Sequence, residues 1–379
     1  MKLRPHQSIH RMAALSLIGL LVGMITSVAT IGFIETIHFF NQLLKVSPDS
    51  RLGLDSSQLA MFTIAALTFG GLLVGLLLQY ATEKGAVHGP ADAIYAVQLR
   101  ERLPPAQSGA ASTLAVIFSL GCGASVGQYG PLVYLGALVG QLTNRLHLGI
   151  RDIRSITIAC GVAAAISTAF NAPIAALIFT HEVILRHYSL RMFAAVTVAS
   201  ACGYVVANVI FHYPPLFLIE FDKPLHATEF LLFALEGIFC GFIAVIFMRL
   251  LSWSMRLSKS LVALQVPEVL GIGQEVFRQA SVSGHYTAEG LLLILVCKLL
   301  ATVICLGFGF AGGVMSPSLL IGLMFGALFA LLVPEYLLED YSGLAVYAIC
   351  GMVAVMSPVI GAPMTALLLV FEFTRNYEI

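Results

Sequence analysis

Long stretches with almost no charge recur along the whole chain of 379 residues, and they constrain its fold more than any other feature. A helix needs roughly 20 apolar residues to cross a hydrocarbon core of about 30 Å. Charged residues make up 11% of the sequence, less than half of their share in an ordinary soluble domain. The sequence therefore predicts an all-α polytopic membrane protein. The stretches are 12–34, 57–81, 109–143, 155–180, 192–220, 231–248, 285–334 and 341–371.

The N-terminal segment 1–11 carries Lys2, Arg4 and Arg11 and no acidic residue. By the positive-inside rule we expect this segment in the cytoplasm, with the rest of the chain in an inner or plasma membrane. A cleaved signal peptide would account for the first apolar stretch alone, so the repetition of such stretches argues against it. The formal net charge is zero and no run of Lys and Arg occurs, so no nucleic-acid partner is expected.

The seven cysteines lie singly in apolar stretches, without the spacing of a disulfide framework or a metal site. They are expected to be small buried apolar residues. The apolar stretches contain no His-Glu-x-x-His, Gly-x-Ser-x-Gly or paired-aspartate arrangement, which disfavours an intramembrane enzyme. We therefore expect no metal, no cofactor and no enzymatic activity. A membrane scaffold or receptor stays open as an alternative to a transport protein.

A glycine-rich block occurs once in each half of the chain. "GCGASVGQYGPLVYLGALVG" (121–140) matches "GFGFAGGVMSPSLLIGLMFG" (307–326) at constant spacing. The coinciding positions are too many to dismiss, even in a glycine-rich chain. They are Gly121/Gly307, Gly123/Gly309, Gly127/Gly313, Pro131/Pro317, Gly136/Gly322 and Gly140/Gly326.

A second block follows the first in both halves. "NAPIAALIFTHE" (171–182) matches "GAPMTALLLVFE" (361–372), and each run ends in a glutamate at the same distance from its proline. The order of the blocks is thus duplicated, which indicates an internal repeat. We expect two membrane repeats, 12–215 and 231–379, joined by a polar linker, 216–230.

The proline turns within these blocks predict helix starts at membrane depth. Proline is favoured in the first turn of a helix, and a helix start presents unpaired N–H groups and roughly half a positive charge. Non-helical backbone at this depth is tolerated where protein or a water-filled cavity covers it. Several converging helix starts would bind an anion without a Lys or Arg. Close packing explains the spacings Gly136/Gly140 and Gly322/Gly326, but it does not explain the proline turns.

At these residues the sequence resembles the CLC family of chloride channels and proton/chloride antiporters, over nearly the whole chain. "GQYGP" (127–131) is similar to the family's Gly-Lys/Arg-Glu-Gly-Pro motif, and "GVMSP" (313–317) to its Gly-x-Phe-x-Pro motif. "FNAP" and "HEV" (170–183) are similar to the segment of its inner acidic pair, and "KGAVHGPADA" (84–93) stands in the place of Gly-Ser-Gly-Ile-Pro. The resemblance implies an inverted-repeat bundle of tilted and re-entrant helices, a lipid bilayer and a homodimer. It also implies a final pore helix, which would lie beyond Ile379.

The departures from the family pattern concern proton handling. Where the family has its gating glutamate, this chain has Tyr129, and a phenol ionises only near about pH 10. Where the inner pair has two acids, this chain has Glu182 and Val183. The family's anion-coordinating serine aligns with His88, and a protonated imidazole would make anion binding depend on pH.

The resemblance and its departures predict a passive channel for chloride or a similar monovalent anion, uncoupled from protons. Tyr129 would be its gate position, as a plug or as a hydroxyl ligand, and Glu182 with Val183 its inner acidic position. The alternative is a proton-coupled antiporter of chloride or another halide, with a proton route through His88 or His181. The predicted anion-binding and pore residues are His88, Gly89, Gln128, Tyr129, Gly130, Val314, Met315 and Ser316.

Overall fold

The computed structural model describes most of the chain. The described residues are 5–44, 46, 56–82, 87–99, 103–143, 152–213, 229–257, 287–333, 337 and 341–374, with side chains from residue 12 in the first range and from residue 61 in the third. The predicted linker 216–230 lies almost entirely outside the described residues, as do the basic side chains of segment 1–11.

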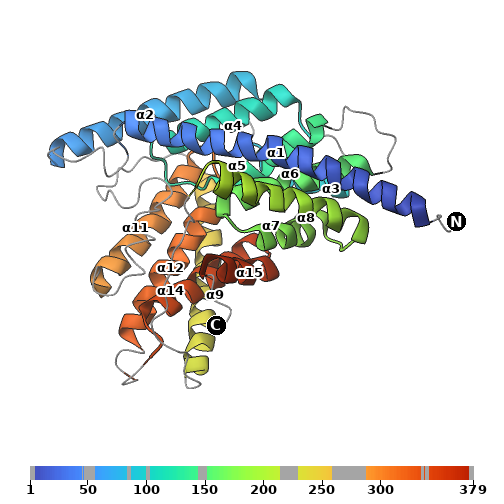
Figure 1. Cartoon of the computed structure of the whole chain (residues 1–379). Coiled ribbons are helices and arrows are strands. Elements are labelled where there is room, and N and C mark those ends of the chain that lie inside the picture. Colours follow the sequence, from blue (N-terminus) through green and yellow to red (C-terminus); the bar gives the residue numbers. More distant parts are fainter. Residues whose placement is uncertain are drawn as a thin grey trace. The chain divides into compact units, whose positions relative to one another are not determined.

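By its internal contacts the chain forms two compact units, and each takes segments from several parts of the sequence. Unit 1 consists of Met1–Glu35, Ala81–Thr113 and Tyr129–Leu216, and unit 2 of Thr36–Tyr80, Leu114–Gln128 and Phe217–Ile379. The long helix α1 (Pro5–Leu43) and the helix α4 (Ala106–Gly121) therefore each contribute to both units (Figure 1). The division into two repeats at 12–215 and 231–379 stays a prediction.

Helices build both units. Unit 1 contains α3 (Pro90–Gln98), α5 (Tyr129–Thr143), α6 (Ile153–Phe170), α7 (Pro173–Phe179), η4 (Thr180–Leu185), α8 (Leu190–Val205) and η5 (Val206–Ile210). Unit 2 contains α2 (Ser56–Ala81, of which the last residue belongs to unit 1), α9 (Phe230–Leu257), α11 (Ala288–Gly307), α12 (Met315–Leu332), α14 (Leu344–Ile360) and α15 (Pro363–Thr374). The described residues form no β-strand, which confirms the predicted all-α class.

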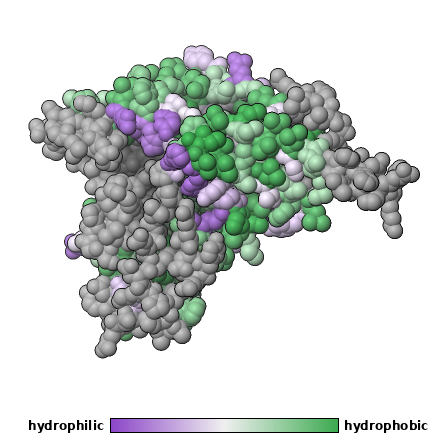
Figure 2. All heavy atoms as spheres, in the orientation of Figure 1, coloured by the Kyte–Doolittle hydropathy of each residue, from purple (hydrophilic) through white to green (hydrophobic). Residues whose placement is uncertain are grey.

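The helices have the length and the surface of membrane spans. Among the described residues, seven helices are long and apolar enough to cross a bilayer. Large apolar side chains point outward from them, for example Leu17, Leu72 and Phe242. Figure 2 shows apolar residues over much of the described surface. An apolar exterior of this kind is stable in lipid, so the prediction of a multi-pass membrane protein is confirmed.

The proline turns begin helices, as the sequence predicts. α5 begins at Tyr129 and α12 at Met315, in each case two residues before the proline. α7 and α15 begin at Pro173 and Pro363 themselves. The helices that precede Pro173 and Pro363 are α6 and α14. Each is capped at its C-terminal end by a residue in the left-handed conformation, Asn171 with φ 60° and Gly361 with φ 72°. This closure turns the chain sharply, and the following proline starts a new helix in a new direction.

Glycines allow the helices after these turns to pack backbone to backbone. In unit 1, a methyl group added at Gly136 of α5 would collide with the carbonyl oxygen of Gly161 in α6. In unit 2, a methyl group at Gly322 of α12 would collide in the same way with Gly351 of α14. The predicted close packing at these glycines is confirmed. We call these two contacts the α5/α6 seam and the α12/α14 seam; in Figure 1, α12 and α14 run side by side.

Candidate functional site

The two glycine-rich turns have the same backbone shape. Gly123 and Gly309, which match in the sequence repeat, both have φ 90°, a conformation that glycine adopts without strain. The turns pair with each other in unit 2: the N–H of Gly127 donates to the carbonyl of Gly313, and the N–H of Gly313 donates back, both at 2.7 Å. The sequence predicts two related turns, and the structure joins them by their matching glycines.

Side chains from neighbouring helices hold the paired turns in place. The hydroxyl of Ser119 accepts a hydrogen bond from the N–H of Ala311 at 3.0 Å. The hydroxyls of Ser125 and Thr302 lie 3.1 Å apart and share a hydrogen bond. A methyl group added at Gly127 would lie 2.8 Å from the carbonyl oxygen of Gly313, so the two bridged turns approach as closely as their backbones allow.

Two buried polar side chains flank the bridge in unit 2. Gln128 and Ser316 are each 1% exposed, and Gln128 Oε1 and Ser316 Oγ have no hydrogen-bond partner among the described residues. Ser316 Oγ lies against the Gly127 backbone, 3.1 Å from the place of an added methyl group. Val314 and Met315 precede it at the start of α12, where the first N–H groups of a helix have no acceptor within the helix. The arrangement offers hydrogen-bond donors and little negative charge.

Tyr129 is fixed by an aromatic neighbour in unit 1. Its ring stacks on Phe170, the last residue of α6, with the ring centroids 3.8 Å apart and the planes at 20°. Tyr129 is 2% exposed, and Gly130 beside it is buried as well. The residue that the sequence predicts as a gate thus occupies a packed position. Phe170 was not predicted, because no local pattern reveals that the end of α6 meets the start of α5.

His88 is also held by protein groups in unit 1. Its Nε2 lies 2.9 Å from Ser108 Oγ and its Nδ1 lies 3.5 Å from Asp92 Oδ2. Its backbone N–H donates to Ser112, and the ring stacks on Tyr134 at 5.2 Å. The N–H of the neighbouring Gly89 donates to Asp92 at 2.8 Å. An anion at His88 would therefore replace or share one of these bonds.

The inner acidic position lies in a widened helical turn. Glu182 and Val183 belong to η4, which continues α7 and whose backbone hydrogen bonds join residues five apart in place of four. Both are partly exposed, whereas His181 is fully buried, with Nδ1 3.0 Å from the carbonyl oxygen of Leu177. A hollow of about 330 Å³ opens beside the end of η4. It is lined by Val97, Gln98, Asp152, Ser155, Leu185, Arg186, His187 and Met192.

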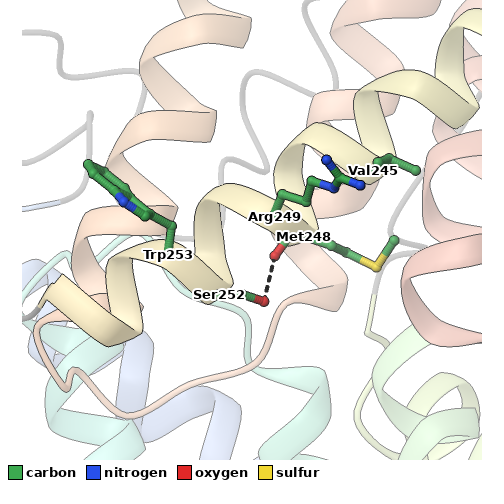
Figure 3. Close-up of a pocket in the computed structure, with 5 residues that line it drawn as sticks. All are labelled: Val245, Met248, Arg249, Ser252 and Trp253. Atoms are coloured by element: carbon green, nitrogen blue, oxygen red, sulfur yellow. Dashed lines mark hydrogen bonds between the residues drawn. The ribbon is translucent and has the colours of Figure 1, made fainter.

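A larger, shallow hollow lies along the outer face of α9 in unit 2. Its volume is about 520 Å³, and its lining residues all come from this one helix. Figure 3 shows the Ser252 hydroxyl bonded back to the Met248 carbonyl, at 2.9 Å, while Arg249 and Trp253 extend from the helix. Trp and Arg near a helix end are typical of the membrane–water interface. The hollow is lined by one helix alone and has none of the converging donors of an anion site.

Comparisons with known proteins concern the chain as a whole. Residues 70–379 match the sequence model of the family described as "Voltage gated chloride channel". A "Putative chloride channel protein ClcB-like" of Ralstonia nicotianae is 27% identical, over 95% of this chain and 88% of its own length. An "H(+)/Cl(-) exchange transporter ClcA" of Vibrio cholerae is 29% identical, over 96% of this chain and 82% of its own length.

Two solved structures have the same fold. A slow cyanobacterial Cl⁻/H⁺ antiporter aligns with a TM-score of 0.79 at 24% identity, over 100% of this chain and 91% of that one. A CLC-type fluoride/proton antiporter aligns with a TM-score of 0.73 at 21% identity, over 96% and 90%. The family model, which covers most of the chain, and the shared fold lead to one conclusion: the chain belongs to the CLC family of voltage-gated chloride channels and related antiporters.

Proposed function

We propose that the chain is a passive channel for chloride or a similar monovalent anion, uncoupled from protons. The observation that carries the proposal is Tyr129, which stands in place of the family's gating glutamate and stacks on Phe170. A swinging carboxylate competes with the anion and takes up a proton when it leaves; a stacked phenol does neither at neutral pH. Val183 in place of the second inner acid removes the other group that would carry a proton.

Anions would bind at the helix starts that frame the paired turns. The backbone N–H groups of Gln128, Tyr129 and Gly130 at one start, and of Val314, Met315 and Ser316 at the other, are the proposed donors. The buried hydroxyl of Ser316, which has no hydrogen-bond partner among the described residues, adds a side-chain donor, and Gln128 lies buried beside it. Such groups attract a negative charge without a fixed cation, so the ion is held weakly enough to leave. His88 and Gly89 complete the proposed set of pore residues.

A proton-coupled antiporter is the second candidate, favoured by the names of several relatives. In this chain the proton would need other carriers than the family's glutamates. His88 lies 3.5 Å from Asp92 and 2.9 Å from Ser108, and His181 Nε2 is buried without a hydrogen-bond partner among the described residues. Either histidine is a chemically reasonable proton carrier.

The proposal also covers the membrane location, the orientation and the assembly of the protein. The basic segment 1–11 favours a cytoplasmic N-terminus in an inner or plasma membrane. Membership of the family favours a homodimer with one pore in each subunit. The two repeats, 12–215 and 231–379, would run in opposite directions through the bilayer.

Substitution of Tyr129 tests the proposal. In liposomes, the wild type should release chloride at a rate that barely changes as external pH rises from acidic to neutral. Tyr129→Glu restores a carboxylate, so chloride efflux should fall severalfold as external pH rises and the acid ionises. Tyr129→Phe keeps the stacking on Phe170 and should behave as the wild type, and Tyr80→Phe on the exposed face of α2 is the control. Strong pH dependence of wild-type efflux that disappears in His88→Gln would favour the antiporter instead.

A further inference from the structure

One carboxyl group is buried deep in unit 2, away from the proposed anion site. Glu236 lies on α9 and is 1% exposed. Its Oε1 points into the α12/α14 seam: a methyl group added at Gly326 would lie 2.8 Å from this atom, and one added at Gly351 would lie 2.9 Å from it. The two glycines thus form a cradle that any larger residue would fill.

The cradle provides little to stabilise a negative charge. Neither carboxyl oxygen of Glu236 has a hydrogen-bond partner of normal geometry among the described side chains and backbone, although the Gly351 backbone lies nearby. The titratable groups that face it are Glu229 and Cys240 on its own side and Tyr347 and Cys350 on α14, whereas α12 contributes Gly326. Lys298 on α11 lies near Cys305. An isolated carboxylate in such a place costs several kcal/mol, and the neutral acid avoids most of this cost.

The corresponding place in α1 holds no acid. Aligning the Gly-x-x-x-Gly pairs of the two helices, Gly19/Gly23 in α1 and Gly237/Gly241 in α9, puts Ile18 opposite Glu236. Ile18 is buried too. The buried position before the glycine pair of α1 is therefore apolar, and the acid at the matching position of α9 requires an explanation of its own.

A second carboxyl group lies at the start of the same helix. Glu229, directly before α9, accepts hydrogen bonds from the backbone and hydroxyl of Ser342 and from the hydroxyl of Tyr347, at 2.6 to 3.1 Å. Glu236 lies about 10 Å further along the helix axis. Tyr347 is within electrostatic range of both carboxyl groups. Beyond Glu236 follow Cys240 and apolar residues such as Ala244 and Phe247, so these polar groups end at Glu236 on the inner side. Glu229, at the start of the helix, is itself buried.

We infer that Glu236 is a buried proton-binding site, loaded and unloaded through Tyr347 and Glu229, whose proton keeps the α12/α14 seam closed. Loss of this proton leaves a charge between Gly326 and Gly351, and the seam must open or admit water. α12 carries the helix start of the proposed anion site at its other end, so the opening displaces that start and lowers conduction. The site is a dead end for protons and controls conduction without coupling to it. The effect on conduction depends on the proposed function; the proton-binding site does not.

Infrared difference spectroscopy tests the site without any transport measurement. The purified protein is titrated from mildly acidic to alkaline pH, and the C=O stretch of protonated carboxylic acids is followed. We expect a band that persists at neutral pH in the wild type and in Glu289→Gln, an exposed acid in the first turn of α11, and that is absent in Glu236→Gln. A band unchanged in Glu236→Gln would overturn the inference.

Chloride efflux from liposomes tests the control of conduction. In the wild type, chloride efflux should fall severalfold at alkaline pH. The proposed inversion of the second repeat places the start of α9 on the outer side of the membrane. External pH should therefore change the efflux, and internal pH should not. Glu236→Gln keeps the shape of the acid but has no charge to gain, so its efflux should not respond. Tyr347→Phe removes the hydroxyl that donates to Glu229 and should slow the response to a pH jump without changing its endpoint.

The infrared measurement and the efflux measurement test different parts of the inference, and each can contradict its own part. Absence of efflux in all variants would contradict the proposed function and leave the infrared result to decide on the proton site. Equal pH dependence in wild type and Glu236→Gln would overturn the control of conduction. Should Glu236→Gln not fold, Tyr347→Phe and its delayed response give the same decision: an undelayed response contradicts the route through Tyr347.

Discussion

The α5/α6 seam of unit 1 and the α12/α14 seam of unit 2 are built alike, yet a carboxyl group enters the second. In both, paired glycines bring backbones into contact: Gly140 of α5 meets Thr157 of α6, and the matching Gly326 of α12 meets Tyr347 of α14. Against the second seam lies Glu236, at a helix position where α1 has Ile18. The glycine pattern thus sets the packing, and the helix that packs against it sets the chemistry.

On our proposals, two seams of similar build would serve two different tasks. A seam that contains glycines and apolar groups is stable under all conditions, because nothing in it titrates. A seam that encloses an acid without good partners is stable while the acid is neutral. On our proposals, the two helix starts would bind the anion, and the acid against the second seam would make that seam sensitive to protons.

The largest expected effect comes from exchanging the two residues. Ile18→Glu places an acid in unit 1, where no cradle is formed for it, and should destabilise the protein by about 2–7 kcal/mol. Glu236→Leu removes the buried acid from unit 2 and should leave stability equal or raise it. Thermal unfolding in detergent, followed by loss of the monodisperse species, measures both. Equal destabilisation by the two variants would contradict the difference between the units.

An intermediate effect is expected from alanine in the seams. Gly136→Ala and Gly322→Ala each push a methyl group into the facing backbone and should cost about 1–3 kcal/mol. Gly32→Ala in α1 and Gly237→Ala in α9 are the matched controls, because a methyl group there meets nothing within 4 Å. The controls should be neutral or stabilising by up to about 1 kcal/mol. The same unfolding assay compares them, and similar behaviour of the two seams is the expected result.

The smallest effect concerns the paired turns. Gly309→Ala forces alanine to φ 90° in otherwise open space and should cost about 1 kcal/mol. Gly123→Ala has the same backbone cost and adds a collision, because the methyl group would lie 2.7 Å from a Val46 methyl. The difference in unfolding temperature between the two variants thus isolates the packing contribution. A larger loss for Gly309→Ala than for Gly123→Ala would show that the turns are not equivalent.

Much of the fold can be predicted from the sequence because it follows from local patterns. Apolar length predicts the spans, proline predicts the helix starts at Tyr129, Met315, Pro173 and Pro363, and glycine spacing predicts the seams. Each of these signals acts within one helix or one turn, where chemistry and geometry are directly related.

The arrangement around the site depends on contacts between segments that are distant in the sequence, and local sequence patterns do not predict such contacts. The bridge between Gly127 and Gly313, the stacking of Tyr129 on Phe170 and the bonds of His88 to Ser108 and Asp92 all require the folded chain. Glu236 lies in a stretch whose hydropathy predicts a membrane-spanning helix and nothing more specific. Its burial between two glycines emerges when α9, α12 and α14 are packed.

The measurement that tests the central claim most directly is chloride efflux from liposomes that contain the purified protein, with external pH recorded at the same time. Valinomycin balances the charge with potassium, and the proton ionophore is added late. An uncoupled channel should release chloride with no proton movement before the ionophore is added. Proton uptake in fixed proportion to chloride, and against a proton gradient, would contradict the account and show that coupling survives without a glutamate at position 129 or 183.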